Sequence, residues 1–321
     1  MNKLLNVQDL KTYFYTSTSI VKAVDNITFE VESNETVGLV GESGCGKSTA
    51  ALSVPRLIAS PPGKILQGKI AFKERSLLDL PEREMKKIRG KEISMIFQDP
   101  MTFLNPVMKI GQQIQETILA HQPEDVKNVK TRVIEALEMV QIPSPRNVAE
   151  MYPYELSGGM RQRALIAMAI SCKPDLVIAD EPTTALDVTV QAQILTLFER
   201  LRDEFRSSLF LITHDLGVVS EICDRVYIMY AGKIVESGDV ISIYEAPAHP
   251  YTTGLLKSAL SIDQFKKTLV TIEGTVPDLI NPPMGCRFHP RCPFVKPICK
   301  QQEPRWTQTE PEHLVSCWLY E

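Results

Sequence analysis

The residues best suited to chemistry form a glycine-rich stretch near the start of this 321-residue chain. Gly41 is followed by four residues and then by Gly46, Lys47 and Ser48, a pattern typical of a loop that binds phosphate. The glycines allow a tight turn whose backbone N–H groups, with the N-terminus of the following helix, attract a polyanion. We expect Lys47 to contact the β- and γ-phosphates of a nucleotide and the Ser48 hydroxyl to bind Mg²⁺. The remaining candidates in this loop are Ser43, Gly44, Cys45, whose backbone N–H is the group used, and Thr49.

Two carboxylates end a short apolar run further along the chain. Asp180 and Glu181 follow Leu176–Ala179, which reads as a buried strand. We expect Asp180 to hold Mg²⁺ through water, and Glu181 to orient or polarise an attacking water as a general base. Two acids at a strand end are common by themselves, but their position after a phosphate loop favours the catalytic interpretation.

A serine and two glycines form a third candidate site. Ser157, Gly158 and Gly159 precede a helical stretch, so a hydroxyl and exposed amides at a helix N-terminus make a second anion site. By itself this pattern fits an ordinary serine N-cap. The run from Leu156 to Met160, however, resembles the signature motif of the ATP-binding-cassette (ABC) ATPases, and that motif is very specific.

The other motifs of that family are matched in the same order, over roughly residues 4–240. Gln98 matches the Q-loop glutamine, Asp187 in Ala185-Leu186-Asp187 matches the D-loop, and His214 matches the switch histidine. The resemblance implies catalytic roles for Lys47, Gln98, Glu181 and His214, and Mg²⁺ contacts from Ser48, Gln98 and Asp180. It also implies that Ser157, Gly158, Gly159 and Asp187 contact ATP.

An aromatic side chain near the N-terminus stacks on adenine in this family. Phe14 is favoured by its spacing, and Tyr13 is the second choice. The resemblance further implies that the signature motif completes the nucleotide site of a second ATPase subunit, so that two cassettes close head-to-tail over two ATP molecules.

Short apolar runs alternating with helical patterns must position these residues. Such alternation predicts an α/β fold with a mostly parallel sheet and helices on its faces. Further strands before the phosphate loop and near residue 70 are candidates for antiparallel pairing. The expected strands are Ile27–Val31, Thr36–Val40, Lys69–Phe72, Ile93–Phe97, Leu176–Ala179 and Leu209–Thr213. The expected helices are Ser48–Leu57, Ile110–His121, Lys127–Val140, Val188–Phe205 and Tyr251–Leu260.

The composition changes near residue 246. Ten of the 22 prolines and four of the seven cysteines lie beyond it, and no periodicity extends far after Thr275. We therefore expect a nucleotide-binding domain over 1–246, with a helical subdomain at about 99–175, and a C-terminal extension over 247–321. This fold is a P-loop ATPase core with a mixed sheet, a helical subdomain and a small Pro/Cys-rich C-terminal domain. The extension has too few apolar residues for its own core, so it must dock onto the first domain or be cross-linked.

The four cysteines of the extension are Cys286, Cys292, Cys299 and Cys317, separated by five, six and seventeen residues. Thiols close in sequence in a reducing compartment more often bind metal than form disulfides. Zinc sites usually contain a tight cysteine pair, which is absent here, whereas longer spacings suit a [4Fe–4S] cluster. Zn²⁺, with His289 able to replace one ligand, and free or disulfide-linked thiols are the alternatives.

The extension resembles that of bacterial oligopeptide and dipeptide importer ATPases of the D type, through His249-Pro250-Tyr251 and the run from Gly285 to Phe294. Some members of that subfamily carry a [4Fe–4S] cluster. The resemblance implies two membrane permease subunits, an extracytoplasmic peptide-binding protein and a second, different ATPase chain as partners. It places the protein at the cytoplasmic face of the cell membrane. An importer of nickel or another small solute, and a soluble ABC ATPase that acts on nucleic acid, are the rival interpretations.

Composition narrows these alternatives. The net charge is −4, which argues against nucleic acid as a main partner. Apolar residues make up 44% and charged residues 23%, as in ordinary globular proteins, so disordered and fibrous classes are excluded. No stretch approaches the roughly 18 apolar residues of a membrane span, and the first residues lack the apolar run of a secretory signal.

Overall fold

A computed structural model describes residues 3–184, 187–263 and 272–321. The chain forms two compact units. The helical unit comprises residues 33–35 and 79–211, and the phosphate-loop unit comprises the described residues of 2–32, 36–78 and 212–321. The phosphate loop and the C-terminal extension thus belong to the same unit. The domain division expected near residue 246 stays a prediction.

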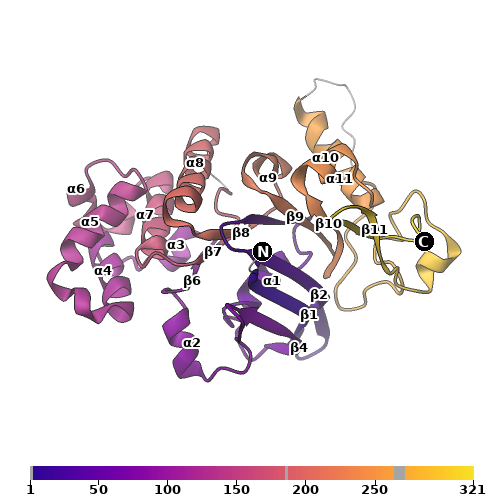
Figure 1. The fold of residues 1–321 in the computed structure, drawn as a ribbon, viewed down its shortest axis with the longest axis horizontal. Helices are drawn as coiled ribbons and strands as arrows, with labels where there is room; N and C mark the ends of the chain where they lie inside the picture. The colour runs from indigo at the N-terminus through magenta and orange to yellow at the C-terminus, as the bar shows by residue number, and fades with distance from the viewer. Residues whose placement is uncertain (1–2, 185–186, 264–271) are drawn as a thin grey trace. The chain divides into compact units, whose positions relative to one another are not determined.

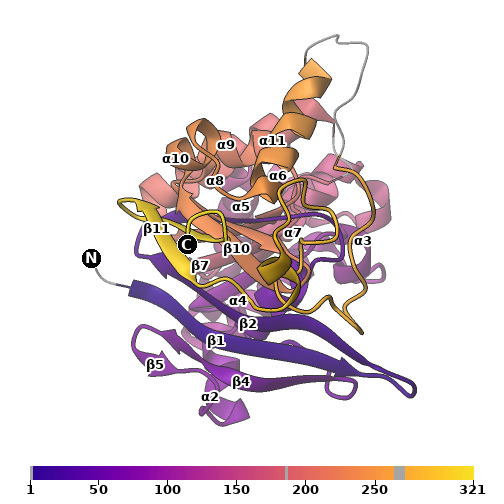
Figure 2. The ribbon, with the colours of Figure 1, turned by 90° about the vertical axis from the view of Figure 1, so that its right-hand side faces the viewer.

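An antiparallel sheet makes one layer of the phosphate-loop unit, with strand order β2-β1-β4-β5 (Figure 2). The strands are β1 (Lys3–Tyr15), β2 (Ile20–Glu32), β4 (Gly63–Phe72) and the two-residue β5 (Arg75–Ser76). Leu5, Val7, Leu10 and Phe29 on β1 and β2 are almost completely buried, so one face of this sheet packs into the core. The antiparallel strands expected near residues 27–31 and 69–72 are confirmed as parts of β2 and β4.

A mixed sheet makes the second layer of this unit, in the order β11-β12-β10-β9-β3. The strand before the phosphate loop, β3 (Thr36–Val40), pairs in parallel with β9 (Arg225–Tyr230). From β9 toward the edge of the sheet, each further strand pairs antiparallel with the one before it. These strands are, in order, β10 (Lys233–Asp239), β12 (His313–Ser316) and β11 (Trp306–Glu310). Two strands of the extension thereby continue the sheet, although no periodicity in the sequence had predicted them.

The helices of this unit are short, apart from one in the extension. They are α1 (Lys47–Ser53), α9 (Leu216–Ile222), α10 (Val240–Glu245), α11 (Pro250–Asp263) and the 3-10 turn η3 (Pro297–Lys300). The expectation that the first helix would reach Leu57 was wrong. Pro55 has no N–H to donate, and Arg56 has a φ of 56°, outside the right-handed helical region.

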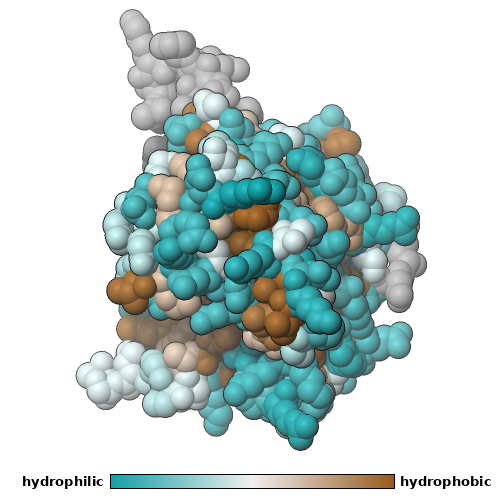
Figure 3. Space-filling view, turned by 90° about the vertical axis from the view of Figure 1, so that its left-hand side faces the viewer, coloured by the Kyte–Doolittle hydropathy of each residue, from teal (hydrophilic) through white to brown (hydrophobic). Residues whose placement is uncertain are grey.

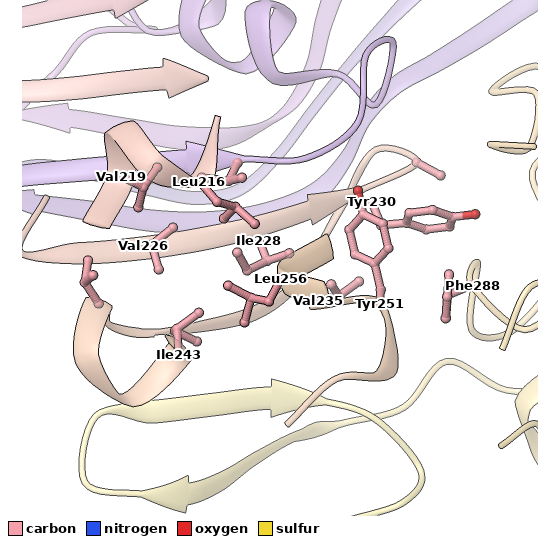
Figure 4. Packing of buried hydrophobic residues seen from close by; sticks show 13 residues of the cluster. Leu216, Val219, Val226, Ile228, Tyr230, Val235, Ile243, Tyr251, Leu256 and Phe288 are labelled. Atoms are coloured by element: carbon pink, nitrogen blue, oxygen red, sulfur yellow. The ribbon is translucent and has the colours of Figure 1, made fainter. Parts of the chain in front are cut away.

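The extension docks into the core of the phosphate-loop unit, as its own shortage of apolar residues predicted. Phe288, which is 2% exposed, joins a buried cluster that also contains Val40 from β3, Tyr230 from β9 and Tyr251 from α11. Figure 4 shows the side chains of this cluster, with Tyr230 and Tyr251 side by side. The strand that leads into the phosphate loop therefore shares its core with the cysteine-rich segment.

The helical unit contains two parallel strands and most of the longer helices (Figure 1). The strands are β6 (Ile93–Ile96) and β7 (Leu176–Asp180), and β8 (Ser208–Thr213) spans the boundary between the units. The helices are α2 (Glu82–Ile88), α3 (Pro100–Phe103), α4 (Ile110–His121), α5 (Val129–Met139), α6 (Pro145–Ala149), α7 (Gly158–Ile170) and α8 (Val188–Phe205), with the turns η1 (Pro123–Lys127) and η2 (Pro153–Glu155). The bounds expected for α4 and α8 are confirmed.

None of the helices in the described part of the chain combines the length and the apolar character that crossing a bilayer requires.

Candidate nucleotide site

The phosphate loop joins β3 to α1, and its lysine is held against the loop backbone. All five residues of β3 are buried, so the strand fixes the start of the loop. Lys47 Nζ donates hydrogen bonds to the carbonyl oxygens of Gly41, at 2.7 Å, and Glu42, at 3.1 Å. The Lys47 side chain is thus kept at the loop, where an ammonium group can meet phosphate oxygens.

Close packing explains two of the loop glycines. A Cβ atom at Gly46 would lie 2.1 Å from the carbonyl oxygen of Ala23, and Gly46 has a φ of 109° that other residues rarely adopt. A Cβ atom at Gly41 would lie 2.1 Å from the carbonyl oxygen of Met229. Any other residue at either position would displace the loop.

The other predicted loop residues divide by exposure. Ser43, Gly44 and Ser48 are exposed and Thr49 is half-buried, so hydroxyls and backbone face solvent at the start of α1. Cys45 is completely buried, and burial raises the pKa of its thiol to about 11. That thiol stays protonated near neutral pH, in agreement with a purely structural role for its side chain.

In the helical unit, the structure brings together two candidates that are 83 residues apart in sequence. Gln98, just after β6, donates from Nε2 to Glu181 Oε2 at 3.1 Å. Thr184 also donates to that oxygen from Oγ1, at 3.0 Å. The neighbouring Asp180 ends β7 and is 7% exposed. Sequence reasoning missed Thr184, whose only signal was its position three residues after Glu181.

The signature serine caps a helix. Ser157 Oγ accepts a hydrogen bond from Met160 N at 3.3 Å at the start of α7. A Cβ atom at Gly158 would meet nothing within 4 Å, whereas one at Gly159 would lie 3.1 Å from Val190. Ser157 and Gly158 are exposed, so the N-terminus of this 13-residue helix is accessible to an anion.

Asp187 and His214 each lie where a helix or strand ends. Asp187 caps α8, because its Oδ1 accepts from Val190 N at 2.9 Å. Ala185 and Leu186, which complete the D-loop match, lie outside the described residues. His214 follows β8 directly and is exposed, and the next residue, Asp215, caps α9.

The two aromatic candidates differ in their surroundings. The Tyr13 hydroxyl donates to Asp25 Oδ1 at 2.8 Å, and its pKa is raised to about 12 by burial and by that carboxylate. Phe14 pairs with Gly63 of β4, and a Cβ atom at Gly63 would lie 2.9 Å from its ring. Adjacent strand residues point to opposite faces, so only one of these rings can serve a given nucleotide.

The four cysteines of the extension are all at least partly buried. None is in a disulfide, and the Cys286 N–H donates to the carbonyl oxygen of Cys299 at 2.9 Å. Burial raises the pKa of the Cys286 thiol to about 12, and charge on any of the other three thiols would raise it further. Burial likewise raises the pKa of the Cys292 and Cys317 thiols, and charge on neighbouring cysteines adds to the effect. Within the described residues, no three metal-ligating side chains lie close enough together to hold a single ion.

Two family models match this chain. The model described as ABC transporter matches residues 24–184, which include the phosphate loop, Gln98, the signature motif and both strand-end carboxylates. The chain belongs to the ABC transporter ATP-binding family. A second model, described as oligopeptide/dipeptide transporter, C-terminal region, matches residues 235–299 of this ABC ATPase.

Relatives match almost the whole ABC ATPase chain. It is 48% identical to the oligopeptide transport ATP-binding protein AppD of Bacillus subtilis, over 100% of this chain and 98% of the relative. It is 46% identical to the oligopeptide transport ATP-binding protein OppD of Escherichia coli, over 98% of this chain and 93% of the relative. Among solved structures, a dimeric ATP-binding cassette in a post-hydrolysis state with ADP and Pi aligns with a TM-score of 0.67 and 25% identity. That alignment covers 74% of this chain and 98% of the cassette. The P-loop ABC ATPase fold expected from the sequence is therefore confirmed.

Proposed function

We propose that this ABC ATPase powers the import of oligopeptides or dipeptides through a membrane transporter. The observation that carries the proposal is the C-terminal extension, because the ATPase motifs are shared by all members of the family. Residues 235–299 match the C-terminal region of oligopeptide/dipeptide transporters, and the relatives compared above are named for transport of oligopeptides.

In this proposal each motif has a separate task in ATP hydrolysis. Lys47 and the loop amides bind the β- and γ-phosphates, and Glu181 takes the proton of the attacking water. Gln98 donates to Glu181 and thereby orients the carboxylate. His214 takes the catalytic role that its match to the switch histidine implies, and Phe14 or, as second choice, Tyr13 stacks on adenine.

Magnesium suits the oxygen atoms available at these motifs. Hydroxyl, amide and carboxylate oxygens are the ligands that Mg²⁺ prefers. Ser48, Gln98 and Asp180 would hold the ion, which neutralises charge on the transferred phosphate when bound. Ser48 is exposed at the start of α1, and Asp180 lies at the carboxyl end of β7.

Partner subunits complete the proposed machine. Ser157, Gly158, Gly159 and Asp187 would contribute to the ATP site of a second ATPase chain, a different one in a heterodimer. Two permeases in the membrane and an extracytoplasmic peptide-binding protein would complete the transporter, with this chain at the cytoplasmic face and no nucleic acid involved.

The segment after Gln98 supports a permease contact. Met101, Phe103 and Val107 are 50%, 44% and 80% exposed, an unusual concentration of exposed apolar side chains in seven residues. Figure 3 shows the molecule from the left-hand side of Figure 1, and on this face separate apolar patches interrupt a hydrophilic surface.

A [4Fe–4S] cluster held by Cys286, Cys292, Cys299 and Cys317 would serve as a structural cross-link of the extension. A cubane spreads its four thiolate ligands, whereas a zinc ion draws three or four of them into one tight shell. The spacings of five, six and seventeen residues between the four cysteines, without a tight pair, favour the cluster over Zn²⁺. Protein purified without oxygen should be brown and contain about four irons and four sulfides per chain. A colourless protein with one zinc per chain would contradict this assignment.

The transport proposal is tested by purifying the chain together with its membrane partners. We expect two permease subunits to copurify and the ATPase rate of the complex to rise when the binding protein carries a peptide. Recovery of nucleic acid without a permease, or stimulation by nickel but not by peptides, would overturn the proposal.

A further inference from the structure

Glu42 is the second residue of the phosphate loop, and the loop pattern leaves its identity open. In the structure, two side chains of the C-terminal extension hold it. Arg291 donates from Nη1 to Glu42 Oε2 at 2.7 Å and from Nη2 to Oε1 at 3.1 Å. The Tyr251 hydroxyl accepts a hydrogen bond from the Glu42 backbone N–H at 2.9 Å. One loop residue is therefore held at its side chain and at its backbone.

Arg291 is fixed in place by its own environment. Its side chain is only 4% exposed, and all five N–H donors of the guanidinium have partners. Besides the carboxylate of Glu42, the acceptors are the Tyr230 hydroxyl at 3.4 Å and the carbonyl oxygens of Glu273 at 2.9 Å and Ile272 at 3.2 Å. The arginine of this two-pronged pair is buried, although the Glu42 side chain is 28% exposed, so the pair constrains both groups more strongly than a fully exposed ion pair would.

Tyr251 is equally constrained. It is completely buried, and its ring centroid lies 4.6 Å from that of Tyr230 and 5.4 Å from that of Phe288. The ring cannot swing away without disrupting this core cluster. Its hydroxyl therefore offers the Glu42 amide a fixed acceptor, and this assigns a structural task to the tyrosine of the His-Pro-Tyr motif.

Glu42 is also hydrogen-bonded to Lys47, the lysine of the phosphate loop. Its carbonyl oxygen accepts from Lys47 Nζ at 3.1 Å, alongside that of Gly41 at 2.7 Å. A shift of Glu42 would move this carbonyl and would release Lys47 from the position that the loop gives it. The contacts of the extension with Glu42 thus reach the phosphate-binding ammonium through one residue.

We propose that Arg291 is a positioning residue for ATP binding, which acts by holding Glu42 so that the phosphate loop keeps the form that receives phosphates. The C-terminal extension thereby contributes to nucleotide affinity and does not serve only to identify the transporter type. The inference rests on ATP binding by the family and is independent of the transported substrate.

The test measures the affinity of the purified full-length wild-type chain and its variants for a non-hydrolysable ATP analogue. We expect Arg291→Met to weaken binding roughly tenfold, because a charge-assisted pair that orders the loop is lost. Glu42→Gln should have a similar effect, and the double variant should be no weaker than either single variant, since both remove one interaction. Arg291→Lys keeps the charge but not the fork, and should recover part of the affinity.

Arg225→Met is the matched control. Arg225 is a second arginine of the phosphate-loop unit that pairs with a carboxylate, that of Glu30 at 3.3 Å, and it lies opposite Val37 in the part of β3 remote from the phosphate loop. Its loss should lower thermal stability while nucleotide affinity stays within about twofold of wild type.

Steady-state kinetics of the assembled transporter separate positioning from general damage. Arg291→Met should raise the KM for ATP and leave kcat at saturating ATP largely intact, because ground-state and transition-state binding are weakened together. Unchanged affinity in a folded Arg291→Met protein would overturn the proposal. So would an equal loss of affinity in Arg225→Met, or additive losses in the double variant.

Discussion

Truncating Phe288 tests whether the extension is part of the ATPase core. The side chain is 2% exposed, and its ring centroid lies 5.1 Å from Tyr230, 5.4 Å from Tyr251 and 5.7 Å from His249. Removing a buried phenylalanine side chain costs about 3–5 kcal/mol, which combines the lost burial with the cavity left behind. Since three rings surround the site and none can easily fill the space, we expect Phe288→Ala to lower the free energy of unfolding by about 4 kcal/mol.

Urea unfolding, monitored by tryptophan fluorescence, measures this loss of unfolding free energy in the extension itself. Both tryptophans of the chain, Trp306 and Trp318, lie in the extension. The midpoint should fall by more than about 1 M urea. Phe294→Ala is the matched control, because Phe294 lies six residues away and is 60% exposed. That variant should stay within about 0.5 kcal/mol of wild type. A Phe288→Ala protein as stable as the Phe294→Ala protein would refute the docking of the extension into this core.

Three further predictions concern chemistry, pH and the loop. Glu181→Gln should keep ATP binding but lower the rate of hydrolysis, measured by phosphate release, by about 10²-fold or more. Turnover near the wild-type rate would exclude Glu181 as the general base. His313 donates from Nε2 to the buried Glu236 at 2.7 Å, which raises the pKa of His313 above its usual value. The protonated His313 contributes fully to stability below the unfolded-state pKa of about 6.5, and this contribution is lost as the pH rises through the raised pKa of the folded state. In His313→Gln, the free energy of unfolding measured by urea titration should therefore fall less steeply as the pH rises above about 6.5 than it does in the wild type. Gly46→Ala should abolish ATP binding, measured by calorimetry, because its Cβ would lie 2.1 Å from the Ala23 carbonyl oxygen; wild-type affinity would contradict the packing argument.

Sequence predicted those parts of the structure that depend on local patterns. The strand before the phosphate loop and the helices Ile110–His121 and Val188–Phe205 have the expected bounds, because apolar spacing and flanking residues define them. The helix after the loop was predicted too long, because Pro55 and the positive φ of Arg56 outweighed its apolar pattern.

Local sequence patterns could not predict contacts between segments that lie far apart in the sequence. The pairing of Gln98 with Glu181 joins residues 83 apart, and that of Arg291 with Glu42 joins residues 249 apart. Neither partner carries a local signal for the other, since an arginine in a polar segment is ordinarily a solvated side chain. The strands Trp306–Glu310 and His313–Ser316 were missed for a related reason. They are short strands at one edge of the sheet, where β12 pairs with β10 and β11 pairs with β12, and they bury few apolar side chains of their own.

The most direct test of ATP-driven peptide import is uptake of a labelled oligopeptide into vesicles that contain the chain, its permeases and the binding protein. We predict uptake that requires ATP on the side of this subunit and that is abolished by Glu181→Gln, with peptide binding to the binding protein unchanged. ATP hydrolysis by the assembled complex without uptake of any di- or oligopeptide, or uptake that persists with Glu181→Gln, would contradict the account.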